Sequence, residues 1–143
     1  MGHSLDALPL LDKVIELNPK LEQAWISRGE ALYFLGRGDE ALDAFKQAIS
    51  LNPRAASAWA AFGALLASLE RYEEALRSLD HALANDIVPK EPRTYKLKAE
   101  ALQALGRTAE AEAAAAEAAR LELVHAEALA DDPGEQAKQD NNA

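Results

Sequence analysis

Apolar residues return at intervals of three, four and seven along most of this 143-residue chain. Trp25, Leu32 and Leu35 follow this spacing in one stretch, and similar spacing continues beyond them. Such intervals place apolar side chains on one face of an α-helix, which completes a turn in about 3.6 residues. The pattern predicts six helical segments, at residues 22–35, 39–51, 56–69, 73–84, 94–105 and 110–123.

Short polar turns divide these segments into pairs. The two helices of each pair are joined by "GRG", "ERY" or "GRT", and Asn52-Pro53 ends the second helix of the first pair. Glycine and Asn-Pro are strong turn signals. The abundance of alanine and the scarcity of valine and threonine favour helix over strand, so the sequence predicts an all-α chain.

The helix pairs repeat along the chain. The stretch "IELNPKLEQAW" at 15–25 recurs as "ISLNPRAASAW" at 49–59, which sets Trp25 and Trp59, the only two tryptophans, 34 positions apart. A third and weaker copy places Tyr95 in the same slot, 36 positions after the second tryptophan. A period of this length is typical of helical repeat arrays.

Small residues recur where the helices of a pair would cross. Gly29 and Ala41 allow the two backbones of the first pair to approach closely, because a larger side chain would wedge them apart. Trp25 and Trp59 are expected to fill the space between neighbouring pairs, while Asn-Pro redirects the chain. A single pair cannot bury its apolar face alone, so the pairs are expected to stack.

These residues resemble the tetratricopeptide repeat (TPR) family, whose pattern is matched in the first unit by Trp25, Gly29, Leu32, Ala41, Phe45, Ala48 and Pro53. The second unit has Ile87 in place of the final proline. The third has lost the proline, the glycine and the large residue of its second helix. The resemblance implies an all-α fold: a right-handed α-solenoid of antiparallel helix pairs (TPR superhelix), with about three repeats, an N-terminal half repeat and a long C-terminal helix.

The predicted organisation has six parts. The opening "MGHS" is interpreted as a cloning remnant, and "LDALPLLDKVIEL" as the second helix of a half repeat, with Asp6 as N-cap and Pro9 in the first turn. No turn signal interrupts the last helix between about Ala109 and Asp132. The parts are the remnant at 1–4, the half repeat at 5–20, TPR units at 22–55 and 56–89, a degenerate unit with an extended helix at 92–130, and a disordered acidic tail at 131–143.

The junction before the third unit differs from the others. Between Leu83 and Tyr95 the chain reads "LANDIVPKEPRTY", which is two residues longer than its counterparts and carries Pro89 and Pro92 in place of Asn-Pro. We expect an altered junction here that tilts or loosens the last pair.

Charge and composition restrict the function classes. The formal charge is −9, and residues 108–143 hold nine acidic and two basic side chains, a sum of −7 that would repel a nucleic acid. No apolar run approaches the roughly 20 residues of a membrane helix, and no secretory signal pattern opens the chain. The sequence predicts no nucleic-acid partner and no membrane partner. A cytoplasmic location is expected from the family resemblance and by default.

Catalytic and metal-binding motifs are missing from the sequence. The chain has no cysteine, and its three histidines are scattered. Glu122 and His125 have the spacing of half a carboxylate-bridged di-metal site, but no second such motif accompanies them, so we interpret them as a solvated helix face. Phosphate-binding glycine loops and nucleophile elbows are also absent. We predict no enzyme activity, no catalytic residue, no cofactor and no metal.

The first helices of the pairs are expected to form the concave face, which in the family that the chain resembles receives an extended or helical peptide. Along this face the side chains change from aromatic, through small, to basic. The alternatives are that its alanines only favour helix formation and that its aromatic residues pack against Leu10 and Leu11. The predicted peptide-binding residues are Gln23, Ile26, Glu30, Tyr33, Phe34, Ser57, Ala60, Ala64, Arg93, Lys96 and Glu100, with Ala61 and Leu97 beside them.

The sequence predicts a non-enzymatic protein–protein interaction module, a scaffold or adaptor. One alternative is an array that associates with itself as a homodimer through the exposed N-terminal helix, and another is a recruitment domain of a larger enzyme or regulator. The family that the chain resembles also includes members that hold chaperone C-terminal carboxylates. Of the positions that would form such a clamp, here Ile26, Glu30, Ala61, Arg93 and Leu97, only Arg93 is compatible, so we expect no chaperone-tail binding.

Overall fold

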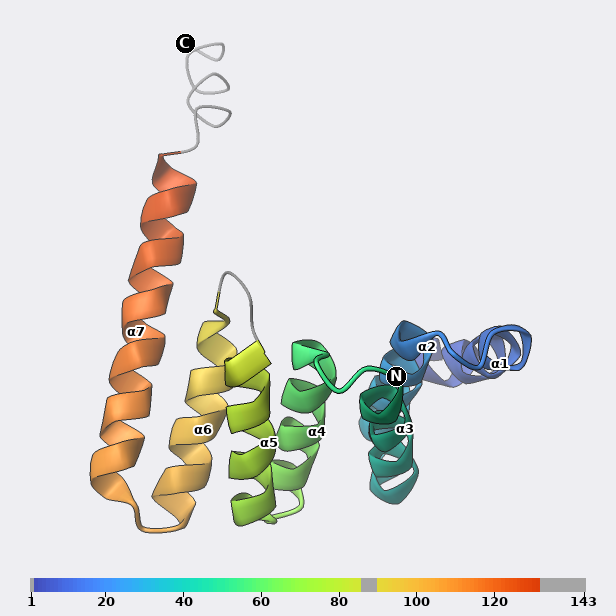
Figure 1. The fold of residues 1–143 in the computed structure, drawn as a ribbon, viewed down its shortest axis with the longest axis horizontal. Coiled ribbons are helices and arrows are strands. Elements are labelled where there is room, and N and C mark those ends of the chain that lie inside the picture. The colour runs from blue at the N-terminus through green and yellow to red at the C-terminus, as the bar shows by residue number, and fades with distance from the viewer. Residues whose placement is uncertain (1, 86–89, 132–143) are drawn as a thin grey trace.

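The computed structural model describes residues 2–85 and 90–131. Within these ranges all regular structure is helical, and consecutive helices pack side by side (Figure 1). α4 to α7 form a row of upright antiparallel helices, whereas α1 is turned away from that direction (Figure 1). The predicted all-α solenoid is confirmed, with helices α1 Gly2–Leu17, α2 Glu22–Phe34, α3 Gly38–Leu51, α4 Ala56–Ser68, α5 Tyr72–Asn85, α6 Pro92–Ala104 and α7 Thr108–Ala130.

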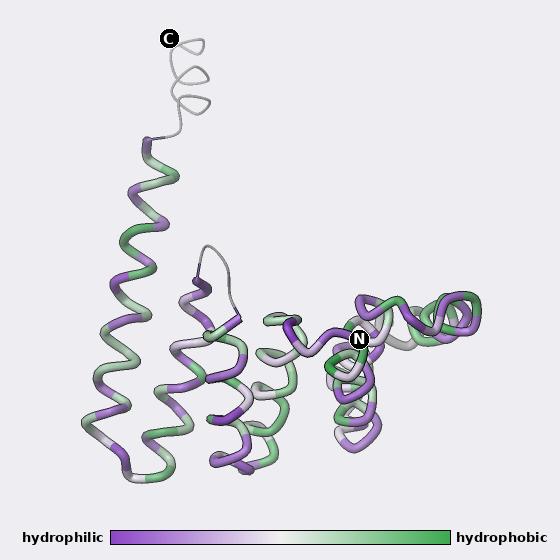
Figure 2. The backbone as a smooth tube through the Cα atoms, in the orientation of Figure 1, coloured by the Kyte–Doolittle hydropathy of each residue, from purple (hydrophilic) through white to green (hydrophobic). Residues whose placement is uncertain are grey.

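Close helix contact explains the recurrent glycines. A Cβ atom added to Gly29 of α2 would lie 2.6 Å from Cε1 of Phe45 in α3, and one added to Gly63 of α4 would lie 2.9 Å from Cγ of Leu79 in α5. Phe45 and Leu79 are 2% and 0% exposed, so both contacts lie in the core. Each of these pairs therefore packs a large side chain of its second helix onto a glycine of its first. Figure 2 shows the alternation of apolar and polar positions along the helices that this packing requires.

The repeated Asn-Pro and Trp residues form a hydrogen-bonded link between pairs. The indole Nε1 of Trp25 donates to the carbonyl oxygen of Pro19 at 3.0 Å, and that of Trp59 donates to Pro53 at 2.9 Å. In the second link the amide of Arg54 also donates to Oδ1 of Asn52 at 3.1 Å, which stabilises the turn. The tryptophans thus fix the direction in which the chain enters the next pair, in addition to filling space.

The turns inside the three pairs share one backbone geometry. In each, an arginine amide donates to a leucine carbonyl five residues earlier at 2.9 Å, and the residue before the arginine has a positive φ. This is the Schellman arrangement, which satisfies carbonyl groups at the end of a helix and favours glycine at the positive-φ position. The turns are Leu32 to Arg37 with Gly36 at φ 72°, Leu66 to Arg71 with Glu70 at φ 59°, and Leu102 to Arg107 with Gly106 at φ 74°.

Replacement of Glu70 by glycine is expected to raise the free energy of unfolding by about 1 kcal/mol, because a non-glycine side chain is strained at positive φ. Urea denaturation followed by circular dichroism would measure the change. The reverse substitution at the equivalent turn, Gly36→Glu, should lower the free energy of unfolding by a similar amount. An unchanged or lower value for Glu70→Gly would show that the turn is not strained.

An ion pair follows each of these turns. Every turn arginine donates two hydrogen bonds of 2.6–2.8 Å to a glutamate three residues later, and these bonds lower the pKa of the glutamate. Since the folded-state pKa is lowered, the pairs stabilise the fold above the ordinary glutamate range, and their contribution is lost as pH falls through the lowered values. The pairs are Arg37 with Glu40, Arg71 with Glu74, and Arg107 with Glu110.

The N-terminal half repeat begins earlier than predicted. Helix α1 starts at Gly2, so Asp6 is not its N-cap and Pro9 lies inside the helix rather than in its first turn. The prediction of a start near Leu5 was wrong, because the fixed φ of proline suits a helix and only its missing N–H and its ring disturb the turn before it.

Two sequence predictions fall outside the described residues. Residues 86–89 belong to the predicted altered junction, of which the structure describes only the end of α5 at Asn85 and the start of α6 at Pro92. The tilt or loosening of the last pair stays a prediction. Residues 132–143 contain nearly all of the predicted disordered tail. The extension of the last helix is confirmed, since α7 is 23 residues long whereas α3 and α5 have 14 each.

Candidate functional site

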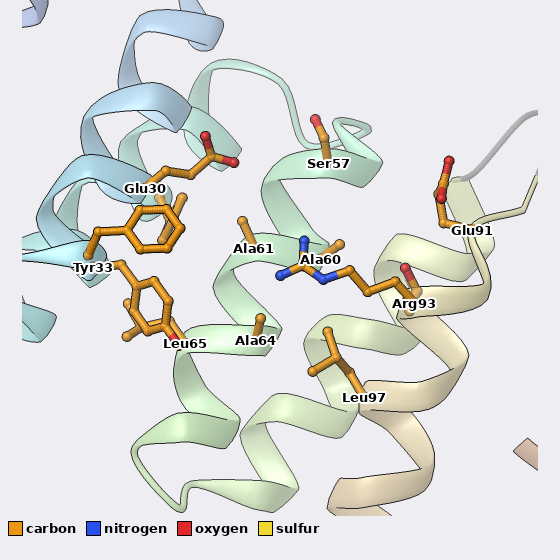
Figure 3. Close-up of a pocket in the computed structure, with 13 residues that line it drawn as sticks. Glu30, Tyr33, Ser57, Ala60, Ala61, Ala64, Leu65, Glu91, Arg93 and Leu97 are labelled. Carbon is orange, nitrogen blue, oxygen red and sulfur yellow. The ribbon is translucent and has the colours of Figure 1, made fainter. Parts of the chain in front are cut away.

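A pocket of about 300 Å³ opens between α2, α4 and α6, the first helices of the three pairs (Figure 3). We call it the α2–α4–α6 pocket. The three helices reach it together because each second helix packs on the other side of its pair. The residues that line the pocket are Glu30, Tyr33 and Phe34 of α2, Phe45 of α3, Ser57, Ala60, Ala61, Ala64 and Leu65 of α4, and Glu91, Arg93, Thr94 and Leu97 at the start of α6.

Aromatic side chains form the α2 wall of the pocket. Tyr33 and Phe34 are 40% and 72% exposed, and their ring centroids lie 5.6 Å apart. Aromatic side chains are enriched at protein binding surfaces, because their burial by a partner is favourable. The wall therefore offers apolar surface that the fold itself leaves uncovered.

Alanine side chains form the floor. Ala60, Ala61 and Ala64 project from α4 into the pocket, and each is half-buried (Figure 3). They share one helix face through their spacing of three and four residues. Since their side chains end at Cβ, the floor is smooth and leaves room for a large apolar group.

Charged side chains stand at two sides of this apolar floor. Figure 3 shows Arg93 reaching from α6 across to Ala60, while Glu30 stands on the α2 wall near Tyr33. Glu91 also lines the α6 side, and its carboxylate points away from the floor (Figure 3). The pocket thus combines an apolar centre with charges of both signs at its edges.

The structure brings together most of the predicted peptide-binding residues, but not all. Glu30, Tyr33, Phe34, Ser57, Ala60, Ala64 and Arg93 line the pocket, as do Ala61 and Leu97. Gln23 and Glu100 are exposed and do not line it.

Two predicted residues have other roles. Ile26 is 2% exposed and belongs to the hydrophobic core, so its assignment to the groove is corrected. Its helical spacing suggested that it faces the groove, but the packing of α2 against the adjacent helices buries it. Lys96 forms an ion pair with Glu122 and so faces α7.

Four lining residues were missed in the sequence. Phe45 and Leu65 are core side chains whose edges reach the pocket, and no surface pattern marks them. Thr94 could have been found, because it lies three positions before Leu97 on the same face of α6, whereas Glu91 precedes the helix as its N-cap residue.

A shallower groove adjoins the aromatic wall. It lies between α1 and α2, has a volume of about 480 Å³, and shares Glu30 and Phe34 with the α2–α4–α6 pocket. Leu10 and Leu11 line it as well, which supports the alternative that Phe34 lies against the half repeat. Even so, Leu10 and Phe34 stay 70% and 72% exposed.

Residues 2–85 and 90–131 contain no group of three or more histidine, aspartate or glutamate side chains that could hold a metal ion. His81 stacks on Trp59 with ring centroids 4.4 Å apart, and Glu122 is engaged by Lys96. None of the seven described helices has the length and apolar character needed to cross a membrane.

Comparison with known proteins agrees with the repeat pattern. The family model described as tetratricopeptide repeat matches residues 22–54. No curated protein sequence matches the chain. This agreement covers α2, α3 and the Asn-Pro link that follows them.

Several solved structures share the fold. The crystal structure of MamA is 25% identical with a TM-score of 0.80, and the match covers 88% of this chain and 72% of MamA. A thermophilic TPR protein of Thermus thermophilus is 27% identical with a TM-score of 0.73, and the match covers 90% of this chain and 74% of that protein. PilW, a type IV pilus biogenesis factor, is 27% identical with a TM-score of 0.78, and the match covers 83% of this chain but only 55% of PilW. The chain therefore spans about half the length of PilW.

Proposed function

Because residues 22–54 are a tetratricopeptide repeat within a solenoid of that fold, we propose that this chain is a non-enzymatic scaffold whose α2–α4–α6 pocket binds a peptide or helix of another protein. The observation that carries the proposal is the exposed aromatic wall beside a floor of alanines. A cytoplasmic location, and the absence of nucleic-acid, membrane and chaperone-tail partners, stay predictions.

The shape of the pocket favours a ligand with one large apolar side chain. Burial of a leucine or phenylalanine side chain contributes roughly 1.5–3 kcal/mol, and the alanine floor leaves the room to accept one. The wall residues Tyr33 and Phe34 lose additional exposed surface when the ligand is bound. Both changes favour an extended or helical peptide over a small polar molecule.

Substitution of Ala64 by tryptophan is expected to abolish peptide binding, because the new ring would occupy the floor. The measurement is enrichment of peptides from a phage-displayed library of random dodecapeptides on immobilised protein. Ala113→Trp, on an exposed part of α7 outside the pocket, is the matched control and should retain the wild-type peptides. If Ala64→Trp, folded by circular dichroism, enriches the same peptides as wild type, the pocket is not the binding site.

Self-association through α1 is the second candidate function, and one comparison within the chain favours it. Leu10 and Val14 are 70% and 39% exposed, whereas Ala44 and Ala48, at the same positions 34 residues on, are 1% and 0% exposed. The difference arises because α3 has a first helix, α2, packed against it and α1 has none before it in the described chain. Analytical ultracentrifugation distinguishes the candidates, since a strict monomer at all concentrations would overturn self-association.

A further inference from the structure

Two opposite charges at the α2–α4–α6 pocket have no partner among the described residues. Glu30 lies on the α2 side and Arg93 on the α6 side, and both are exposed. No hydrogen bond or ion pair within residues 2–85 and 90–131 engages either side chain. The two charges therefore remain available to a ligand.

This arrangement differs from that of most arginines in the chain. Arg28, Arg37, Arg71, Arg107 and Arg120 each form an ion pair with a carboxylate at 2.6–2.7 Å. Arg93 instead extends over the apolar floor towards Ala60 (Figure 3), and none of the described carboxylates forms an ion pair with its guanidinium. A planar guanidinium at such a position is suited to bind a carboxylate through two parallel hydrogen bonds.

The α2 side of the pocket favours a positively charged group of the ligand. Glu30 supplies a carboxylate, and the rings of Tyr33 and Phe34 beside it supply faces that attract a cation. Glu91 adds a second carboxylate on the α6 side, but it points away from the floor and already has a contact of its own (Figure 3). Arg93 is thus the charge on the α6 side that reaches over the floor.

We propose that the ligand of this pocket is a peptide segment with a large apolar side chain on the alanine floor, a lysine or arginine beside Glu30, and an aspartate, glutamate or C-terminal carboxylate beside Arg93. The inference rests on the proposed function and adds the chemical class of the partner segment. A ligand of this kind carries a positive charge on one side of its apolar residue and a negative charge on the other. The pocket would discriminate against peptides that have only apolar residues or only one sign of charge.

The test uses the dodecapeptide library selected on wild-type protein and counter-selected on Ala64→Trp. We expect the enriched peptides to contain a basic and an acidic residue on opposite sides of a leucine or aromatic residue. One such peptide is then synthesised, together with two analogues in which the acidic residue is replaced by its amide or the basic residue by methionine. Binding is measured by fluorescence anisotropy.

The assignment of each charge follows from paired substitutions. Arg93→Gln should weaken binding of the parent peptide by about three- to tenfold, and should not change binding of the amide analogue. Glu30→Gln should weaken the parent peptide by about three- to fivefold and leave the methionine analogue unchanged. Arg77→Gln on α5, outside this pocket, is the matched control and should change neither. These losses of affinity should be smaller at high salt concentration, because salt screens the charges.

Two results would overturn the inference, and they can be told apart. If peptides that depend on the pocket show no charge pattern, or if Arg93→Gln weakens the amide analogue as much as the parent, the pocket binds peptides but not of this class. If no peptide survives the counter-selection on Ala64→Trp, the proposed function fails and the inference fails with it.

Discussion

Substitution of Phe45 by alanine is expected to lower the free energy of unfolding by about 3–5 kcal/mol, the largest single effect of those considered. Phe45 is 2% exposed, and its ring lies against Gly29 of the facing helix. Because the facing residue has no side chain, Gly29 cannot fill the vacated volume without a shift of backbone. The cavity therefore stays open, and its cost adds to the lost burial of the ring.

Urea denaturation of Phe45→Ala, with Phe34→Ala as control, would measure this effect. Phe34 is the same residue type but is 72% exposed, so its removal should change the free energy of unfolding by no more than about 0.5 kcal/mol. Equal destabilisation by the two substitutions would show that the core does not lie between α2 and α3 as described.

Substitution of Gly29 by alanine is expected to lower the free energy of unfolding by about 1–2 kcal/mol, although alanine is the better helix former. The new Cβ would lie within 2.8 Å of three ring atoms of Phe45. A buried aromatic ring is rigid, so the helices must move apart to relieve the overlap. Thermal and urea unfolding would both report the change.

Two comparisons isolate the cause. Gly38→Ala places a Cβ no closer than 3.6 Å to Leu69 and should be neutral or stabilising. In a Phe45→Ala background, Gly29→Ala should change sign and stabilise the chain by up to about 1 kcal/mol, because the overlap is gone and only the helix preference remains. A destabilising effect that persists in that background would locate its origin outside the Gly29–Phe45 contact.

The repeat pattern predicted the helices well because their signals are local. The interval pattern and the turn residues placed the second helix of the first unit at 39–51, and α3 spans Gly38–Leu51. Gly36 and Asn52-Pro53 mark its two ends by backbone conformation alone. Such signals do not depend on any distant part of the chain.

The wrong and missed predictions involve burial, helix boundaries and hydrogen bonds, which the spacing of apolar residues does not determine. Ile26 was assigned to the groove, yet only the packing of α2 against its neighbours decides which apolar residue is core. Pro9 was used as a boundary, but a proline can lie inside a helix at the cost of a hydrogen bond. The bonds from Trp25 and Trp59 to proline carbonyls were missed because they involve backbone atoms.

Arg93 illustrates both sides of this comparison. Its position on the predicted concave face followed from helical spacing, and the structure does place it at the pocket. That it has no ion-pair partner among the described residues, unlike Arg37 or Arg71, could not be known from its sequence context. The charge that we propose for ligand recognition therefore depends on a tertiary property that the sequence does not show.

The one-sided packing of α1 has a consequence for motion. In a linear array, each element is held by its immediate neighbours, so an end element with one neighbour opens more readily than a central one. α1 contacts α2 on one side, has no helix on its other side in the described chain, and contains Pro9. Its backbone amides should therefore exchange with solvent deuterium far faster than those of α3 or α4. The molecule would show a gradient of local opening, in which the apolar surface of α1 is released while the α2–α4–α6 pocket remains folded.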